Sequence, residues 1–367
     1  MKVAVITRHA ITNYGSLLQT IATQDVIENM GFECEIINYI RKDESYWRSE
    51  KTLLKNKEEW NNSFIKKYLY LALRTPESVI AGRRFSKERK KYLNLGKKCT
   101  SIDELSRTSF NADIYMTGSD QVWGPVADGS YDSSYCLSFV GSENKKISYA
   151  SSFGKIDFSE KLKNYYKEWL SGYGSVSVRE KSAVEILGKL KIKAEQVLDP
   201  TLLMDSNEWD KYAEPIKHKN YILVYQIHNN KRLDDYVKRI AEKKKVNIIR
   251  ISPYLHQISR GGKFVWCPRV SKFLSYIKNA NCLITDSFHG TAFAINYNVP
   301  FVEVLPNNNT ETRNISILQM TGLQNRILQD IDNVELIQQK IEYDNVNENL
   351  SYERKKSLDT LKEMLNK

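Results

Sequence analysis

Short apolar runs alternate with helix-like stretches along most of the chain. Lys2–Thr7 and Glu33–Tyr39 have the pattern of buried strands, and Tyr14–Met30 between them has a helical periodicity that Gly31 ends. A strand, a helix and a second strand in close succession indicate a βαβ unit, which predicts a parallel sheet.

The alternation continues in two sets, which indicates two α/β halves. In the first set we expect a helix from Arg179 and strands at Asp113–Thr117, Lys146–Ala150, Gly174–Val178 and Gln196–Leu198. In the second set we expect strands at Tyr221–Ile227, Val246–Ile251, Cys282–Thr285 and Phe301–Leu305. The helices between them are expected at Leu233–Lys243, Ser271–Asn279 and Gly290–Tyr297.

We therefore predict an α/β fold of two Rossmann-like parallel-sheet domains that face a cleft, with ligands bound off the carboxyl ends of the strands. Met204–Glu214 is interpreted as a hinge between the halves. The predicted domains are residues 1–205, with a basic helical insertion at about 41–110, and residues 206–330, followed by C-terminal helices at 331–367.

The composition is that of a globular protein, because 41% of the 367 residues are hydrophobic and 27% are charged. No apolar run approaches the roughly 20 residues that a membrane-spanning helix needs. The N-terminus enters a strand directly, so no signal peptide is expected, and five scattered cysteines without a CxxC pair favour the reducing cytoplasm. Since HExxH, P-loop and GxSxG motifs are lacking in the sequence, we expect no metal and no cofactor.

The net charge of +11 is concentrated in Arg41–Phe110, which holds 18 lysines and arginines against nine acidic residues. Aromatic residues are interleaved with these charges. Such a segment can be a solvated helical insertion, can lie against anionic lipid, or can bind nucleic acid, and nucleic acid is the least favoured of the three.

The strongest chemical signal is Thr285–Thr291, which lies between a predicted strand and a predicted helix. Asp286 or Ser287 is suited to cap that helix, and Gly290 and Thr291 would present free backbone N–H groups at its N-terminus, where partial positive charge favours a phosphate. His289 is placed to donate to that phosphate or to transfer a proton. A capping histidine without a catalytic role is the alternative.

Two other loops are candidates for substrate contacts. Asn13 and Gly15 lie in a small polar loop that opens a helix, without the GxGxxG of a dinucleotide site. After Gly118, polar groups beside an aromatic plane would suit a sugar, and these residues are Ser119, Asp120, Gln121 and Trp123. The alternative for the first loop is a simple N-cap, and the alternative for the second is an ordinary turn with Trp123 packed beneath it.

Two arginines are candidates for anion binding, because a guanidinium recognises carboxylate or phosphate through paired hydrogen bonds. Arg179 lies at a strand end that opens a helix, and Arg313 follows the polar loop Asn307–Thr310, which could close over an anion. Taken alone, an ion pair is the alternative for Arg179 and a solvated surface residue for Arg313.

Taken together and in this order, these segments resemble the polysaccharide pyruvyl transferase family. The matching segments are Asn13-Tyr14-Gly15, Gly118-Ser119-Asp120-Gln121-Val122-Trp123, Ser177-Val178-Arg179-Glu180, Leu198-Asp199-Pro200-Thr201 and Thr285-Asp286-Ser287-Phe288-His289-Gly290. The resemblance implies a GT-B-like architecture and transfer of pyruvate from phosphoenolpyruvate to a sugar of a capsular or exopolysaccharide precursor, as a ketal. It also implies that Arg179 and His289 bind phosphoenolpyruvate.

The residues and the resemblance agree on an anionic ligand. We expect Arg179 and Arg313 to hold the two anionic groups of phosphoenolpyruvate, His289 to be the acid, and Asp120 to be the base or to orient the acceptor hydroxyl. A glycan acceptor linked to a lipid diphosphate would place the protein at the inner face of the membrane. The alternatives are a GT-B glycosyltransferase that uses a nucleotide sugar and a non-enzymatic basic binding protein.

Overall fold

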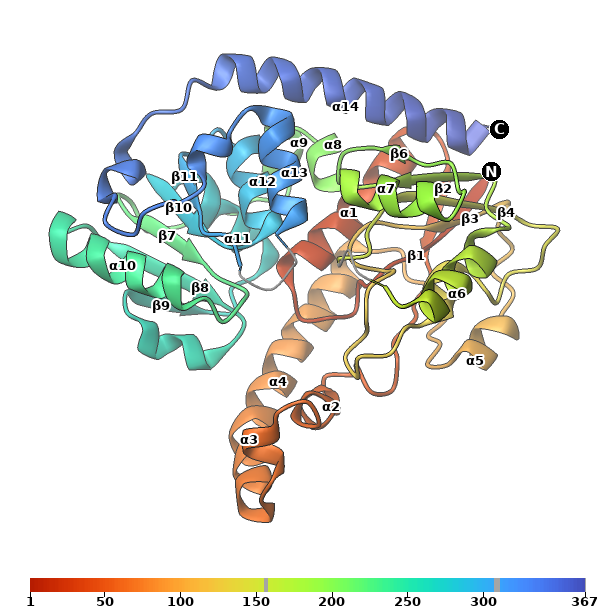
Figure 1. The fold of residues 1–367 in the computed structure, drawn as a ribbon, viewed down its shortest axis with the longest axis horizontal. Coiled ribbons are helices and arrows are strands. Elements are labelled where there is room, and N and C mark those ends of the chain that lie inside the picture. Colours follow the sequence, from red (N-terminus) through yellow and green to blue (C-terminus); the bar gives the residue numbers. More distant parts are fainter. Residues whose placement is uncertain (155–157, 307–310, 367) are drawn as a thin grey trace. The chain divides into compact units, whose positions relative to one another are not determined.

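The structure is a computed structural model that describes residues 1–154, 158–306 and 311–366. The chain divides into two compact units, called here unit 1 (Met1–Pro200 and Ser357–Lys367) and unit 2 (Thr201–Lys356). Each unit is built on a parallel sheet, which confirms the predicted class of two Rossmann-like α/β domains (Figure 1).

The sheet of unit 1 has the strand order β2-β1-β3-β4-β5-β6. Its strands are β1 (Lys2–Ile6), β2 (Glu33–Ile36), β3 (Ile114–Thr117), β4 (Lys145–Ser151), β5 (Ser175–Val178) and β6 (Glu195–Gln196). The direction of strand addition reverses between β1 and β3, because β2 lies on one side of β1 and all later strands lie on the other. In sheets of this type, ligands bind outside the carboxyl ends of the strands at that reversal.

The sheet of unit 2 has the order β11-β10-β7-β8-β9 and reverses between β7 and β10. Its strands are β7 (Ile222–Tyr225), β8 (Ile248–Ser252), β9 (Lys263–Trp266), β10 (Cys282–Thr285) and β11 (Phe301–Glu303). The strands β7 and β10 are entirely apolar except at their carboxyl ends and are buried throughout, as expected of parallel strands covered on both faces.

Helices connect the strands in both units. Unit 1 contains α1 (Tyr14–Asn29), α2 (Ser49–Leu54), α3 (Glu58–Asn61), α4 (Phe64–Tyr92), α5 (Ile102–Ser106), α6 (Glu160–Leu170) and α7 (Lys181–Lys189). The remaining helices are α8 (Pro200–Leu203), α9 (Ser206–Asp210), α10 (Lys231–Lys244), α11 (Val270–Lys278), α12 (Phe288–Asn296), α13 (Thr312–Thr321) and α14 (Tyr343–Asn366). Short 3₁₀ turns lie at Ser133–Cys136, Leu255–Arg260, Gln324–Arg326 and Val334–Gln338.

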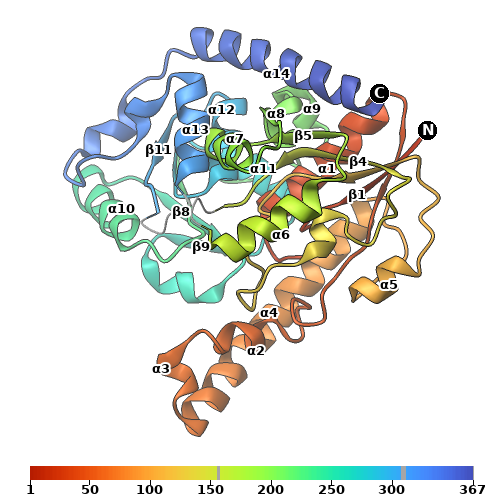
Figure 2. The same cartoon turned by 45° about the vertical axis from the view of Figure 1, so that its right-hand side comes forward.

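The basic insertion is helical, and its helices α2, α3 and α4 form what we call the arm (Ser49–Tyr92). In Figures 1 and 2, α3 and the first half of α4 stand away from the sheet of unit 1. The second half of α4 returns to the unit, where Phe85 packs on Tyr14 of α1 with ring centroids 4.9 Å apart.

Two segments differ from the sequence-based expectation. The interpreted hinge contains α9, which Asp205 and Glu208 hold in a reciprocal capping box and which buries Trp209 completely, so this segment packs as part of unit 2. The C-terminal segment forms a 3₁₀ turn and one long helix, α14, and the boundary between the two units falls within that helix at Ser357.

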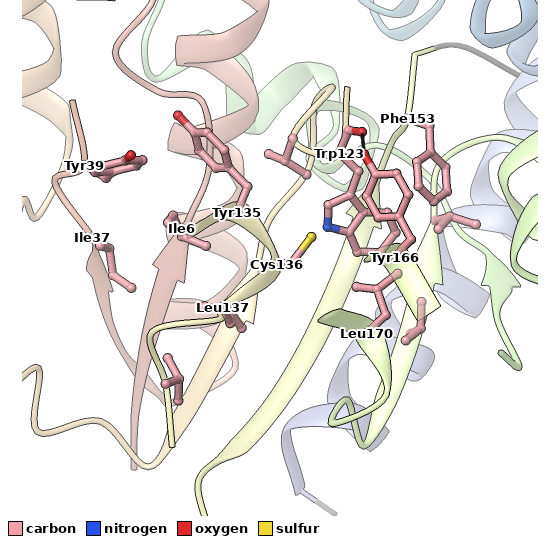
Figure 3. Packing of buried hydrophobic residues seen from close by; sticks show 14 of the residues in the cluster. Ile6, Ile37, Tyr39, Trp123, Tyr135, Cys136, Leu137, Phe153, Tyr166 and Leu170 are labelled. Carbon is pink, nitrogen blue, oxygen red and sulfur yellow. Dashed lines mark hydrogen bonds between the residues drawn. The ribbon is translucent and has the colours of Figure 1, made fainter. Parts of the chain in front are cut away.

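The core of unit 1 is rich in aromatic rings. Figure 3 shows Trp123, Phe153 and Tyr166 packed together, with the ring of Trp123 centred 5.1 Å from that of Phe153. All five cysteines are buried free thiols. Among the described residues, no helix is long and apolar enough to cross a bilayer, and His, Cys, Asp and Glu side chains form no group of three that could hold a metal ion.

Candidate functional site

In unit 1, the two loops predicted from sequence meet at the strand-order reversal. The Asn13 side chain caps α1, because its Oδ1 accepts hydrogen bonds from the backbone N–H groups of Gly15 at 2.8 Å and Ser16 at 3.3 Å. The hydroxyl of Ser16 in turn hydrogen-bonds the carboxylate of Asp120. The loop that follows β1 is therefore joined to the loop that follows β3.

Asp120 has an unusual backbone conformation for a residue with a side chain. Its φ of 75° lies in the left-handed region that favours glycine, and its side chain is almost fully buried. Residues held in such conformations cluster at functional sites, where the surrounding structure enforces them. This geometry fits the role of a positioned carboxylate.

Arg179 is buried among carboxylates. Its Nη1 donates to Asp199 Oδ2 at 2.8 Å, and the same oxygen accepts from Ser119 Oγ at 2.8 Å. The carboxylates of Asp120 and Glu180 approach the guanidinium at 3.9 and 3.8 Å. Burial acts to lower the pKa of Arg179, but these three acids raise it, so the side chain stays a cation. Three residues chosen from sequence, Ser119, Asp120 and Arg179, thus form one polar cluster in unit 1 with Asp199 and Glu180.

Trp123 was expected to offer its ring to a sugar, and the structure corrects this expectation. Only 1% of Trp123 is exposed, and the ring lies in the hydrophobic core against Phe153 (Figure 3). The apolar packing explains why the sequence places tryptophan here. Gln121 is half-buried and packs closely against Gly154. A Cβ added to Gly154 would lie only 2.3 Å from Gln121 Nε2.

In unit 2, the predicted turn lies at the strand-order reversal between β7 and β10. Ser287 caps α12 by accepting from the N–H of Gly290 at 3.3 Å, and its own N–H donates to Thr285 Oγ1 at 3.0 Å. A Cβ on Gly290 would lie 2.5 Å from Thr285 Oγ1 and 3.2 Å from the ring of Tyr225, so the close approach of helix and sheet requires glycine. His289, in the first turn, is 6% exposed.

Asp286 ties the two strands together at this reversal. Its fully buried carboxylate accepts from the backbone N–H groups of Ile227 at 2.8 Å and His228 at 3.3 Å, just beyond the end of β7. His228 Nδ1 also lies 3.6 Å from the same carboxylate. These hydrogen bonds join the residue that precedes the N-cap of α12 to the segment that follows β7.

Thr291 contacts a buried acid that sequence reasoning missed. Glu303, the last residue of β11, hydrogen-bonds the Thr291 hydroxyl through Oε2 and accepts from Asn314 Nδ2 at 2.7 Å through Oε1. Burial raises the pKa of Glu303 to about 8, partly offset by these two hydrogen bonds. Glu303 is therefore mostly protonated at neutral pH.

Arg313 lies beside Asn314 in the first turn of α13 and is more than nine-tenths buried, so it is not a solvated surface residue. The polar loop that was expected to close over an anion, Asn307–Thr310, lies outside the described residues. Arg313 thus remains a candidate for anion binding on its burial and on its place next to the Glu303 pair.

A second polar network in unit 2 was also missed. Arg250 of β8 is fully buried, donates to Gln226 Oε1 at 2.6 Å and pairs with Asp234 at 3.2 Å. Arg260 pairs with the other oxygen of Asp234 at 3.2 Å. The sequence held one sign of this network: Arg250 is the only charged residue of the otherwise mostly apolar strand β8. Glu303 shows the same sign, as the only charged residue of β11.

No curated protein sequence matches the chain significantly. Solved structures do match it in fold. The UDP-GlcNAc 2-epimerase from Neisseria meningitidis bound to UDP-GlcNAc matches with TM-score 0.52 at 10% identity, over 100% of this chain and 99% of that chain. The glycosyltransferase SnogD from Streptomyces nogalater matches with TM-score 0.51 at 12% identity, over 100% and 99%. At such identities the likeness shows a GT-B-like fold alone.

The sequence comparison is more specific. The family model described as "Polysaccharide pyruvyl transferase" matches residues 13–309, which is most of the chain. The match includes the Asn13 cap, the Asp120 and Arg179 cluster and the turn at His289 described above. The chain belongs to the polysaccharide pyruvyl transferase family.

Proposed function

We propose that this chain transfers the pyruvyl group of phosphoenolpyruvate to two hydroxyls of one sugar in a capsular or exopolysaccharide precursor. The observation that carries the proposal is the buried turn Ser287–Thr291, which presents a helix N-terminus and His289 at the strand-order reversal of unit 2. Such a terminus favours a phosphate, and this turn lies within the stretch that matches the family.

The reaction balances without a redox step. The C3 methylene of phosphoenolpyruvate takes a proton and becomes a methyl group, while one sugar hydroxyl adds to C2. The C2–O bond to phosphate breaks, and a second hydroxyl closes the ketal at C2. Of the two protons released by the hydroxyls, one replaces the proton given to C3 and the other leaves with the phosphate.

In unit 2, His289 is the proposed acid and the N-terminus of α12 the proposed phosphate site. The backbone N–H groups of Gly290 and Thr291, which the sequence predicted as free donors, instead donate to Ser287 Oγ at 3.3 Å and to Ser287 O at 3.0 Å. A protonated Glu303 supports this assignment, because a neutral partner for Thr291 adds no negative charge close to a bound anion. Arg313 is proposed to contact an anionic group of the donor.

In unit 1, Asp120 is the proposed base, or orients the acceptor hydroxyl. Its carboxylate is held by Ser16 and lies near the Arg179 guanidinium, which favours the ionised form that a base requires. Arg179 is proposed to contact the donor with a guanidinium that Asp199 orients.

The experiment combines ligand-induced stabilisation with phosphate release. A ligand present at 100 times its dissociation constant stabilises a fold by about 2.7 kcal/mol, which a thermal-unfolding assay detects. We expect phosphoenolpyruvate to stabilise the protein and UDP-GlcNAc, at the same ionic strength, to leave it unchanged. Stabilisation by the nucleotide sugar alone would instead identify a GT-B glycosyltransferase.

His289→Asn tests the proposed acid, with His256→Asn as the matched control because His256 is an exposed histidine of the same unit. With oligosaccharides that carry two free hydroxyls on one sugar as acceptors, we expect His289→Asn to abolish phosphate release at an unchanged unfolding midpoint. The control should keep the wild-type rate. Wild-type turnover in His289→Asn would show that His289 is not the acid.

A further inference from the structure

Unit 1 contains a cavity of about 270 Å³ that the proposed reaction does not use. It opens between the segments that follow β1 and β2 and the second half of α4, at the base of the arm. Its lining includes Asn38, Trp47, Ser86, Arg89, Lys90 and Lys98, and no lining residue is acidic. Because the cavity lies beyond the carboxyl ends of β1 and β2, it is on the same edge of the sheet as Asp120.

Arg89 is the decisive residue of this cavity. It is only 4% exposed, and its Nη1 donates to the backbone oxygen of Ala10 at 3.0 Å. Within the described part of the chain it pairs with no carboxylate, whereas the buried Arg179 and Arg250 each do. Burying an unpaired guanidinium is costly, so an anion that enters the cavity would offset that cost.

The electrostatics around Arg89 agree with an anion site. Burial lowers the pKa of Arg89, to about 10, so the side chain is still a cation at neutral pH. The buried His9 nearby is neutral, because burial and the charge of Arg89 lower its pKa to about 4. Lys90 and Lys98 add two exposed cations at the rim.

We infer that this cavity binds the phosphate group of a phosphorylated saccharide, with Arg89 on the phosphate and the sugar ring against Trp47. Arginine and lysine recognise phosphate, serine and asparagine side chains supply further hydrogen bonds, and an aromatic face suits a ring. That the saccharide is the acceptor rests on the proposed function, but the phosphate site stands without it.

The test is calorimetric titration with pyrophosphate, glucose 1-phosphate and glucose. We expect the two phosphorylated probes to bind and glucose to bind far more weakly. Binding of glucose 1-phosphate but not of pyrophosphate would show that the ring is required. Arg89→Gln should weaken both phosphorylated probes at least tenfold, and Lys98→Gln should weaken them less. Lys91→Gln is the matched control, because Lys91 is an exposed neighbour outside the cavity lining.

Stability separates a binding role from a structural one. Arg89→Gln removes an unpaired buried charge, so its unfolding midpoint should not fall below that of the wild type. Equal binding by wild type and Arg89→Gln, or no binding by the wild type, would overturn the inference. Stabilisation by phosphoenolpyruvate, measured on the same variants, should be unchanged, so a failure of this site and a failure of the proposed function are distinguishable.

A different observation concerns the arm itself. The first half of α4 exposes large apolar side chains at helical spacing, with Phe64 75% and Ile65 78% exposed and Tyr68, Leu69 and Leu73 at least half exposed. Tyr70, on another side of the helix, is buried against α2 and α3 through Glu50 and Trp60. One face of α4 is thus apolar and has no partner within the described chain.

The charges around this face are nearly all positive. The arm has five acids: Glu58 and Glu59 are exposed, Glu88 is half-buried, and Glu50 and Glu77 are buried beside Arg74. The exposed cations of the arm are Lys51, Lys55, Lys57, Lys66, Arg83, Arg84, Lys87, Lys90 and Lys91. A second copy of the same basic face would be repelled, whereas an anionic bilayer offers both apolar depth and negative headgroups.

We propose that this face of the arm docks on an anionic membrane surface, with α4 lying in the interface. Vesicle flotation tests it with phosphatidylcholine alone and with phosphatidylcholine containing phosphatidylglycerol. We expect flotation with the anionic vesicles only, loss of flotation in Ile65→Asp with Leu69→Asp, and no change in the control Ile258→Asp, an exposed isoleucine of unit 2. No flotation, flotation unchanged by the arm variants, or an arm-dependent dimer in solution would each overturn the proposal.

Discussion

Glu303→Gln should stabilise the protein progressively as the pH rises. The Glu303 carboxyl is fully buried, and its pKa is raised from 4.5 to about 8. Glutamine has the same shape. Its Oε1 can accept from Asn314, and its Nε2 can donate to the Thr291 hydroxyl oxygen in place of the hydrogen bond that Thr291 Oγ1 donates to Glu303 Oε2. The substitution therefore removes ionisation and keeps the packing.

The direction in which the free energy of unfolding changes with pH follows from the number of protons that each state binds. Below pH 4.5, both the folded and the unfolded chain hold the proton on Glu303. Between 4.5 and about 8 only the folded chain holds it, so the wild type loses free energy of unfolding with each unit of pH. One unit corresponds to about 1.4 kcal/mol, so the loss between pH 6 and pH 8 is about 2 kcal/mol. For a domain of the size of unit 2, this loss corresponds to a decrease of roughly 4–8 °C in the thermal unfolding midpoint.

The assay is urea unfolding at pH 6 and pH 8, followed by tryptophan fluorescence and far-UV circular dichroism. The measured quantity is the difference in free energy of unfolding between Glu303→Gln and wild type, which should grow by about 2 kcal/mol between the two pH values. Glu342→Gln, at an exposed position of the same unit, should show no such growth. A difference that is the same at both pH values would refute a proton held on Glu303.

Substitutions at three further positions test the packing of the site. Asp199→Asn should cost roughly 3–5 kcal/mol in denaturant unfolding, because it leaves the buried Arg179 without its closest carboxylate; an unchanged unfolding curve would contradict this account. Gly290→Ala should lower the unfolding midpoint, because the added Cβ would lie only 2.5 Å from Thr285 Oγ1. A midpoint at the wild-type value would mean that α12 can move away from β10 at no cost in free energy. Ser287→Ala should cost about 1 kcal/mol in the same assay as a lost N-cap, with Ser287→Gly costing only a few tenths.

Much of the fold could be predicted from the apolar pattern. β10 was expected at Cys282–Thr285 and has those bounds, because a short apolar run between turn residues has few alternatives. β9 and α6 were missed. β9 lies at the sheet edge, is only partly buried, and has an apolar run of only three residues, Phe264–Trp266. The sequence of α6 is dominated by charged and aromatic residues.

The candidate site could be predicted only where its residues follow strands along the chain. The meeting of the loops that hold Asn13 and Asp120 could be predicted, because loops at the carboxyl ends of neighbouring parallel strands lie together. The partners Arg250 and Asp234 come from neighbouring elements whose adjacency depends on the β7–β8 pairing, which one sequence does not reveal. Trp123 was misassigned because burial of an aromatic ring in a turn depends on which rings fold over it.

The placement of α14 has a consequence for folding during synthesis. Unit 1 needs residues made after all of unit 2, because Ser357 Oγ accepts from the N–H of Leu198 at 3.0 Å and Lys145 Nζ donates to the Leu365 backbone oxygen at 3.2 Å. Leu361 and Leu365 are also buried. The sheet of unit 1 is therefore synthesised first and remains without the C-terminal turns of α14 while unit 2 is translated. The two hydrogen bonds above span 159 and 220 residues of sequence. Because such long loops close slowly, the final docking of the C-terminal turns onto unit 1 is expected to be a late step in folding.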